Sequence, residues 1–217
     1  MEKVFNQKRD ELYEDLSDMS EIAEEMLQNS IKALDNKDDE LARQVIERDS
    51  VLDNFQITVE EKVSRLLNQE KPLVKDCTLT IAILKIASDF ERIGDHATNI
   101  AEIVLEVKDE KYLQPLVMIP ELSEIVHDML DAVLDAFITE NVDLAEAVCR
   151  RDEQADNIYE KVYNQTLKLI NRSEKQQDVN QAVRFLTVAK SLERIGDHAT
   201  NIGEETIFMV TGKRVKY

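Results

Sequence analysis

The chain has 217 residues, of which 45 are acidic and 27 basic, so its formal net charge is −18 at pH 7. With only four glycines and three prolines, a loop-rich or collagen-like chain is excluded. The strong negative charge argues against nucleic-acid binding, because neutralising phosphates requires clustered Lys and Arg. It also argues against docking on an anionic membrane surface by charge alone.

No targeting or membrane segment is recognisable. The first residues, MEKVFNQKRDELYEDL, are charged throughout and lack the apolar region of a signal peptide. No stretch approaches the roughly 18 consecutive apolar residues that a membrane-spanning helix needs. We therefore expect a cytoplasmic protein.

The apolar pattern is helical along almost the whole chain. Between residues 79 and 104, apolar side chains recur at steps of three and four, which places them on one face of an amphipathic helix. No run of alternating apolar and polar residues bounded by turns indicates a strand. The pattern predicts an all-α protein.

Five breaks divide the chain into six helical segments. The first break lies at residues 35–37, where Asp38 is a candidate N-cap, and the second is the polar stretch 68–75. Pro115 and Pro120 bracket the largest break, and two more follow at 139–141 and 171–173. Long helices of about 30 residues joined by short turns form antiparallel bundles. We expect six long helices in two sets of three.

The chain contains an internal repeat. Residues 91–100 and 193–202 both read ERIGDHATNI, at a spacing of 102 residues. A weaker match at a spacing of 103 relates Arg48-Asp49 to Arg151-Asp152, and it extends to the Asp-Asn pairs at 53 and 156. The two halves, 1–114 and 115–217, are therefore predicted to be duplicated three-helix bundles.

The repeated decapeptide carries a stripe of oxygen ligands. Its Glu, Asp and Asn lie at i, i+4 and i+8, so on a helix they share one face, turned away from the apolar side. These residues are Glu91, Asp95 and Asn99 in the first copy, and Glu193, Asp197 and Asn201 in the second.

The preceding helix adds a second acidic pair in each half. Asp49 and Asp53 are four residues apart at the edge of the apolar face, and Asp152 and Asp156 repeat them. Four carboxylates brought together would repel one another and have raised pKa values unless a cation neutralises them. Carboxylates without thiolates suit Mg²⁺, Mn²⁺, Ca²⁺, iron or Zn²⁺. The alternative interpretation is a solvated acidic face.

Both copies of the decapeptide contain a glycine, and its presence inside a helix calls for an explanation from packing. Glycine in a helix costs about 1 kcal/mol relative to alanine. Gly94 and Gly196 lie near the apolar stripe, so we expect a tight helix–helix contact at each. For the basic segment 211–217, a frayed tail is favoured over a docking element.

Each copy also contains a histidine and an arginine. His96 and His198 project about 100° around the helix from the preceding Asp, so a polar contact to an adjoining helix or simple exposure is favoured over metal ligation. Arg92 and Arg194 are expected to pair with acids of a neighbouring helix.

Motifs of known enzyme classes are missing from the sequence. It contains no Gly-rich phosphate loop, no HExxH and no GxSxG. The di-iron enzymes built on helix bundles need Glu-x-x-His, whereas the residue three after Glu91 is Gly94. Oxygen chemistry of the di-iron type is therefore disfavoured.

Two copies of ERIGDHATNI, each preceded one helix earlier by DxxxD, resemble the PhoU family of phosphate-signalling proteins over essentially the whole chain. The resemblance implies two three-helix bundles related by a pseudo-two-fold axis, often assembled as a homodimer. It also implies multinuclear metal clusters on the bundle surface, with iron or zinc favoured and Mg, Mn, Ca or Ni as alternatives. The implied metal ligands are Asp49, Asp53, Glu91, Asp95, Asn99, Asp152, Asp156, Glu193, Asp197 and Asn201.

The resemblance further implies a regulator rather than an enzyme. Such a protein restrains phosphate uptake and the phosphate-starvation two-component response by contacting the ATPase subunit of a phosphate ABC transporter and a sensor histidine kinase. It reaches the membrane only through these partners. Two alternatives remain open: a metal-dependent hydrolase or oxidase that uses the carboxylates, and a metal-independent helical adaptor whose acidic stripes dock basic partners.

Overall fold

The computed structural model describes residues 2–69, 74–112 and 118–217, and in this part of the chain it contains six α-helices and no strand. This confirms the predicted all-α class. The predicted boundary between residues 114 and 115 lies outside the described residues. The helices are α1 (Glu2–Asn36), α2 (Asp39–Gln69), α3 (Val74–Val107), α4 (Met118–Ile138), α5 (Val142–Arg172) and α6 (Gln176–Thr211).

The turns that open α2 and α5 are built alike. Asp38 accepts a hydrogen bond from the backbone N of Leu41 at 3.0 Å, and Asn141 accepts one from Leu144 at 3.1 Å. These side chains cap backbone N–H groups that have no partner within the helix. The residue before each cap has a positive φ, 55° at residue 37 and 54° at residue 140. The predicted N-cap at Asp38 is confirmed, and the repeat extends to the backbone of the turns.

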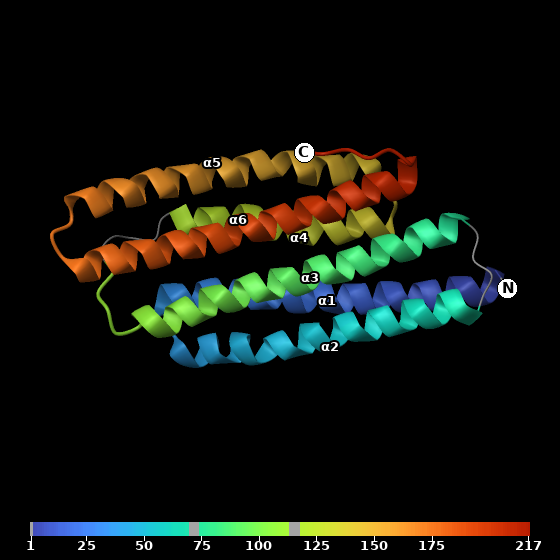
Figure 1. The fold of residues 1–217 in the computed structure, drawn as a ribbon, viewed down its shortest axis with the longest axis horizontal. Helices are drawn as coiled ribbons and strands as arrows, with labels where there is room; N and C mark the ends of the chain where they lie inside the picture. The colour runs from blue at the N-terminus through green and yellow to red at the C-terminus, as the bar shows by residue number, and fades with distance from the viewer. Residues whose placement is uncertain (1, 70–73, 113–117) are drawn as a thin grey trace.

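The six helices form two three-helix bundles that lie side by side, with successive helices running in opposite directions (Figure 1). Within each bundle all three helices contact one another. Between the bundles, α3 packs against α6 and α1 packs against α4. In the described part of the chain, α2 and α5 contact only their own bundle and occupy the outer flanks, at the bottom and top of Figure 1. The helices that carry the repeated decapeptide are therefore central.

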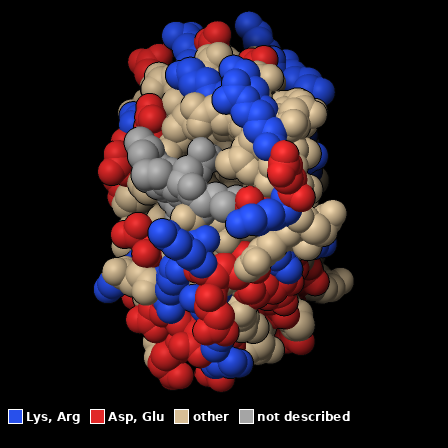
Figure 2. Space-filling view, turned by 90° about the vertical axis from the view of Figure 1, so that its left-hand side faces the viewer, with Lys and Arg blue, Asp and Glu red and all other residues tan. Residues whose placement is uncertain are grey.

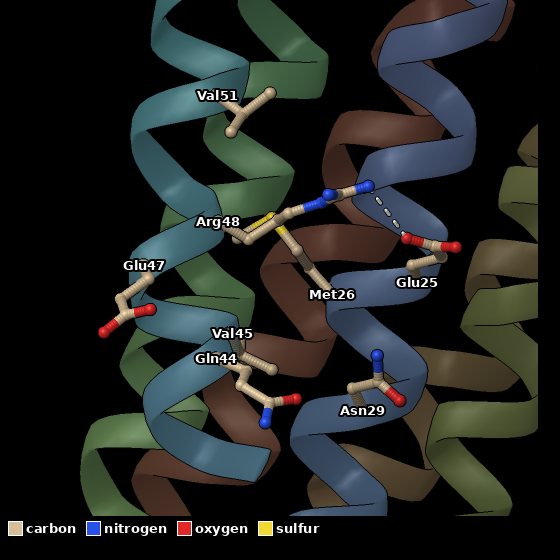
Figure 3. Close-up of a pocket in the computed structure, with 8 residues that line it drawn as sticks. All are labelled: Glu25, Met26, Asn29, Gln44, Val45, Glu47, Arg48 and Val51. Carbon is tan, nitrogen blue, oxygen red and sulfur yellow. Dashed lines mark hydrogen bonds and ion pairs between the residues drawn. The ribbon is translucent and has the colours of Figure 1, made fainter. Parts of the chain in front are cut away.

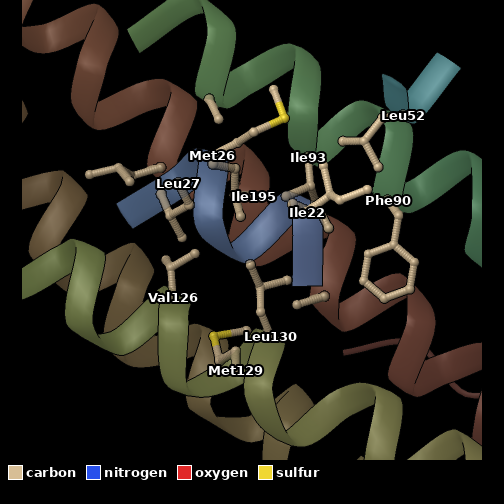
Figure 4. Packing of buried hydrophobic residues seen from close by; sticks show 14 of the residues in the cluster. Ile22, Met26, Leu27, Leu52, Phe90, Ile93, Val126, Met129, Leu130 and Ile195 are labelled. Atoms are coloured by element: carbon tan, nitrogen blue, oxygen red, sulfur yellow. The ribbon is translucent and has the colours of Figure 1, made fainter. Parts of the chain in front are cut away.

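The main hydrophobic core crosses the boundary between the bundles. Met26 of α1 and Ile93 of α3 belong to the same buried cluster as Val126 of α4 and Ile195 of α6 (Figure 4). Leu52 of α2 joins this cluster and is fully buried. Since both halves contribute to one core, each repeat is stabilised by the other.

Charge is unevenly spread at one end of the molecule. Figure 2 shows that carboxylates crowd the lower half of this end, over the first bundle, whereas Lys and Arg gather mainly in the upper half.

None of the described helices is both long enough and apolar enough to cross a membrane.

The segment after α6 folds back along the bundle (Figure 1). Gly212 ends the helix with a φ of 70°. Arg214 forms an ion pair with the buried Glu205, and the backbone N of Tyr217 donates to Glu204 at 2.8 Å. The expectation of a frayed tail is therefore wrong, because two acids at the end of α6 hold the segment.

The glycines of the two decapeptide copies face different neighbours. A Cβ at Gly94 would lie 2.5 Å from Cδ1 of the buried Leu52, so any larger residue would force the Leu52 side chain to move within the packed contact between α3 and α2. A Cβ at Gly196 would lie 3.1 Å from Oδ1 of Asp152. The expected tight contact is confirmed at Gly94, whereas Gly196 makes room for a carboxylate.

Substituting these glycines tests the difference. Gly94→Ala should lower the free energy of unfolding by about 1–2 kcal/mol, because overpacking a buried contact exceeds the gain of about 1 kcal/mol in helix propensity. Gly196→Ala should cost less, since a carboxylate can move by a few tenths of an ångström. Urea denaturation of both variants measures this. Equal losses, or a larger loss for Gly196→Ala, would contradict it.

Candidate functional site

Each bundle brings four carboxylates to the contact between its second and third helices. The first acidic cluster consists of Asp49 and Asp53 on α2 and Glu91 and Asp95 on α3. The second acidic cluster lies on α5 and α6 and consists of the equivalent residues, namely Asp152, Asp156, Glu193 and Asp197. The members of each cluster are close enough to act on one another electrostatically, as the sequence spacing predicts.

In the first acidic cluster, the oxygens are unequally satisfied. Asp49 Oδ1 accepts a hydrogen bond from Thr98 Oγ1 at 3.2 Å. Arg92 donates to Asp95 Oδ2 at 2.8 Å. Its Nε lies 3.3 Å from Glu91 Oε2, yet this buried oxygen has no hydrogen-bond partner. Burial raises the pKa values of Asp49 and Glu91, and repulsion by Asp95 raises them further.

In the second acidic cluster, one carboxylate is strongly perturbed. Asp152 Oδ1 is buried and has no hydrogen-bond partner. Burial, followed by repulsion from Asp156 and Asp197, raises the pKa of Asp152 to about 6. Burial and Asp197 also raise the pKa of Asp156. At the other end of the cluster, Lys190 Nζ lies 2.6 Å from both carboxylate oxygens of Glu193.

The arginines of the decapeptide pair within their own helix. Arg92 contacts Asp95 at 2.8 Å and Arg194 contacts Asp197 at 3.0 Å. The prediction that they pair with acids of a neighbouring helix is therefore wrong. Residues three apart on a helix are surface neighbours, so the guanidinium reaches the nearest carboxylate on the same helix.

A second pair of arginines joins the first and second helices of each bundle. Arg48, directly before Asp49, contacts Glu25 of α1 at 3.2 Å, and its equivalent Arg151 contacts Asp128 of α4. The first pair borders a groove of about 360 Å³ between α1 and α2 (Figure 3). The groove is lined by Glu25, Met26, Asn29, Gln44, Val45, Glu47, Arg48 and Val51. The sequence shows the repeated Arg-Asp but not the partner of its arginine, which lies on another helix.

The asparagines of the decapeptide differ in their surroundings. Asn99 is exposed on α3. The amide nitrogen of Asn201 instead donates across the bundle boundary to Asp89 Oδ1 at 3.3 Å. Of the predicted ligands, Asn201 is therefore engaged with the other repeat through its amide nitrogen.

The two histidines meet where α3 contacts α6. Their ring centroids are 5.7 Å apart, and His198 Nδ1 lies 2.8 Å from Asp89 Oδ1. Burial and then the neighbouring His198 lower the pKa of His96. The expected polar contact to an adjoining helix is confirmed for His198. That the two histidines touch was not predicted, because periodicity does not fix which helices pair.

The residues of both clusters provide the type of ligand atom that a hard cation prefers. They supply only carboxylate oxygens, and Glu91 Oε2 and Asp152 Oδ1, which accept no hydrogen bond, are acceptors that a cation would satisfy. Within the described ranges, no three His, Cys, Asp or Glu side chains are arranged to hold an ion. Ion binding therefore requires carboxylates such as Asp95 and Asp197 to turn from their arginine partners.

Comparison with known proteins gives a consistent result along the chain. The sequence model described as the PhoU domain matches residues 16–104 and again 119–206. A phosphate-specific transport system accessory protein PhoU homolog of Clostridium acetobutylicum is 36% identical over 214 residues, covering 98% of this chain and 97% of its own. The phosphate-specific transport system accessory protein PhoU of Serratia marcescens is 32% identical over 213 residues, covering 98% and 87%.

Solved structures agree with the fold. The crystal structure of PhoU from Pseudomonas aeruginosa superposes with a TM-score of 0.91 and 29% identity, covering 96% of this chain and 100% of its own. The crystal structure of the phosphate transport system regulatory protein PhoU from Streptococcus pneumoniae gives a TM-score of 0.88 and 28% identity, covering 98% and 100%.

The raised pKa of Asp152 predicts a pH-dependent stability. The Asp152 carboxyl group holds its proton more tightly in the folded than in the unfolded protein. Its contribution to the free energy of unfolding is therefore lost as the pH rises through its folded pKa of about 6. Asp152→Asn should therefore raise the free energy of unfolding of chelator-treated protein at pH 7.5 by on the order of 1 kcal/mol, after allowance for solvent screening. Urea denaturation at pH 7.5 and pH 4.5 measures the gain, which should shrink at the lower pH.

The matched control is Glu153→Gln, which removes the same charge from an exposed position on α5. It should leave the stability nearly unchanged at both pH values. A gain for Asp152→Asn that is absent at pH 7.5, or equal at both pH values, would show that repulsion within the cluster does not act as described.

Proposed function

This chain belongs to the PhoU family, and we propose that it is a cytoplasmic regulator of phosphate homeostasis that restrains phosphate uptake and the phosphate-starvation two-component response. The main support for this proposal is the similarity of the chain, over nearly its full length, to proteins named as accessory or regulatory proteins of phosphate transport. PhoU proteins are accessory regulatory proteins and not enzymes. The alternative of a metal-dependent hydrolase or oxidase is thereby set aside.

We propose that the protein acts by direct contact with two partners and as a homodimer. The partners are the ATPase subunit of a phosphate ABC transporter and a sensor histidine kinase, so that association with the membrane is indirect. The names of its relatives, which refer to a phosphate-specific transport system, support the first of these partners.

The two acidic clusters would bind multinuclear metal clusters, with iron or zinc as the first candidates and Mg, Mn, Ca or Ni as alternatives. The proposed ligands are the eight carboxylates of the two acidic clusters, with Asn99 and Asn201 beside them. Bound cations would neutralise repulsion where α2 meets α3 and where α5 meets α6. The buried oxygens of Glu91 and Asp152 that accept no hydrogen bond support this proposal.

The partner proposal is tested by affinity capture of the tagged full chain from cell membranes at high and at low phosphate. We expect the transporter ATPase or the sensor kinase to be recovered, with a yield that depends on phosphate. Each capture is repeated with a chelator, which shows whether metal is needed. Recovery of neither partner under any condition would overturn the regulatory proposal.

The metal proposal is tested with the double variant Asp95→Asn/Asp197→Asn. Loss of one carboxylate per cluster should reduce the metal bound after purification at least tenfold, as measured by inductively coupled plasma mass spectrometry. The control is Glu47→Gln/Glu153→Gln, which removes exposed acids from the same two bundles and should keep the metal. Unchanged metal in the first variant would show that these are not the ligands.

The two readouts together separate the remaining alternative. If Asp95→Asn/Asp197→Asn loses its metal but still captures the partners at the wild-type yield, the protein is a metal-independent adaptor. If metal and partners are lost together while the melting temperature is kept, metal is part of the regulatory surface.

A further inference from the structure

We infer that Lys190 supplies a built-in positive charge to the second acidic cluster, so that the two clusters are not equivalent and the first binds cations more tightly. This inference rests on the proposed metal binding by the acidic clusters. It concerns a residue outside the repeated decapeptide and assigns the two repeats different roles.

The two repeats differ in charge directly beside the identical decapeptide. At the spacing of 102 residues, Lys190 corresponds to Ser88 and Ser191 corresponds to Asp89. The second repeat therefore carries a lysine where the first has a neutral serine, whereas Asp89 contacts His198 and Asn201 of the second repeat. Since the ten residues that follow are the same, this lysine is a local difference that can act on otherwise matched ligands.

Lys190 is held against the second acidic cluster by two contacts. Its Nζ lies 2.6 Å from both oxygens of Glu193, whose side chain is only 12% exposed. The same ammonium lies 5.1 Å from the ring centroid of Tyr159 on α5, at cation–π distance. The residue equivalent to Tyr159 in α2 is Gln56, so the first repeat lacks both the lysine and the ring.

The other cations near the clusters are matched between the repeats. Arg92 contacts Asp95 at 2.8 Å, and Arg194 contacts Asp197 at 3.0 Å. Their Nε atoms lie 3.3 Å and 3.9 Å from the preceding glutamate. The equivalents Glu91 and Glu193 therefore differ mainly in the lysine: Glu91 Oε2 has no hydrogen-bond partner, whereas both oxygens of Glu193 accept from Lys190.

A cation that uses Glu193 must either displace the ammonium of Lys190 or bind beside it. Displacement breaks two charge-assisted hydrogen bonds, and binding beside it places two positive charges a few ångströms apart. Both routes weaken cation binding at the second acidic cluster by about tenfold or more. At the first acidic cluster Ser88 is neutral, so a cation there meets only the cost of Arg92 beside Glu91, which Arg194 also imposes at the second.

The test uses Zn²⁺ titrated into metal-stripped full-length protein by isothermal titration calorimetry. Each cluster is measured alone, in a background that disables the other: Asp152→Asn/Asp197→Asn leaves the first cluster, and Asp49→Asn/Asp95→Asn leaves the second. We expect the first cluster to bind Zn²⁺ about tenfold or more tightly than the second. Metal content after dialysis, measured by mass spectrometry, gives an independent readout.

Reciprocal variants then exchange the charge between the repeats. Lys190→Ser should raise the Zn²⁺ affinity of the second cluster about tenfold, and Ser88→Lys should lower that of the first. Lys190→Arg retains the charge and should leave the second cluster weak. Lys161→Ser removes an exposed lysine of α5 and should change neither cluster, which controls for net charge.

The outcomes distinguish failure of the role inferred for Lys190 from failure of the proposed metal binding. If neither cluster binds Zn²⁺ in the wild-type chain, the metal proposal fails and this inference fails with it. If both clusters bind with equal affinity, or if Lys190→Ser leaves the second cluster unchanged while its melting temperature is kept, the metal proposal stands and the role of Lys190 is overturned. Tighter binding in Lys190→Ser but not in Lys161→Ser supports it.

Discussion

The site depends on one constraint: carboxylates of two neighbouring helices are held close together at the contact between those helices. In each bundle, two carboxylates from one helix and two from the next lie at a helix–helix contact, where burial and mutual repulsion both disfavour the ionised form. The surrounding residues answer this repulsion locally, since Thr98 donates to Asp49 and the decapeptide arginines turn to the nearest aspartates. Two buried oxygens remain without a hydrogen-bond partner, so the clusters are only partly compensated by the protein itself.

Duplication has kept the geometry of this site while changing how it is compensated. The turns before α2 and α5, the decapeptide and the arginines that join neighbouring helices are repeated in position and in contact. The residues just outside the decapeptide are not, and Lys190 and Tyr159 give the second acidic cluster a cation that the first lacks. Repeats that share a backbone can in this way carry carboxylate clusters of different net charge, which is the basis of the proposed difference in cation affinity.

The sequence predicts what periodicity and duplication can encode. The six helices and the cap at Asp38 follow from patterns along single helices, and the grouping of four acids follows when two consecutive antiparallel helices are placed side by side. The structure contains all of them. Contacts between helices that are distant in the chain could not be predicted from the sequence. The meeting of His96 with His198 depends on the packing of α3 against α6, which no local pattern specifies. The fold-back after Gly212 was missed because it depends on one buried acid, Glu205, rather than on an apolar pattern.

The placement of the acidic stripes on α3 and α6 joins the proposed cation sites to the contact between the repeats. Asp95 is followed directly by His96, and His96 lies against His198 of the other repeat, which in turn contacts Asp89. A step of one residue along the helix therefore separates each cluster from the boundary that both bundles share. A ligand shifts an equilibrium toward the arrangement that it binds more tightly. Because the helices that hold the carboxylates also hold the two halves together, cations at the proposed sites would bias the relative placement of the bundles, which is the kind of coupling that the proposed regulatory role needs.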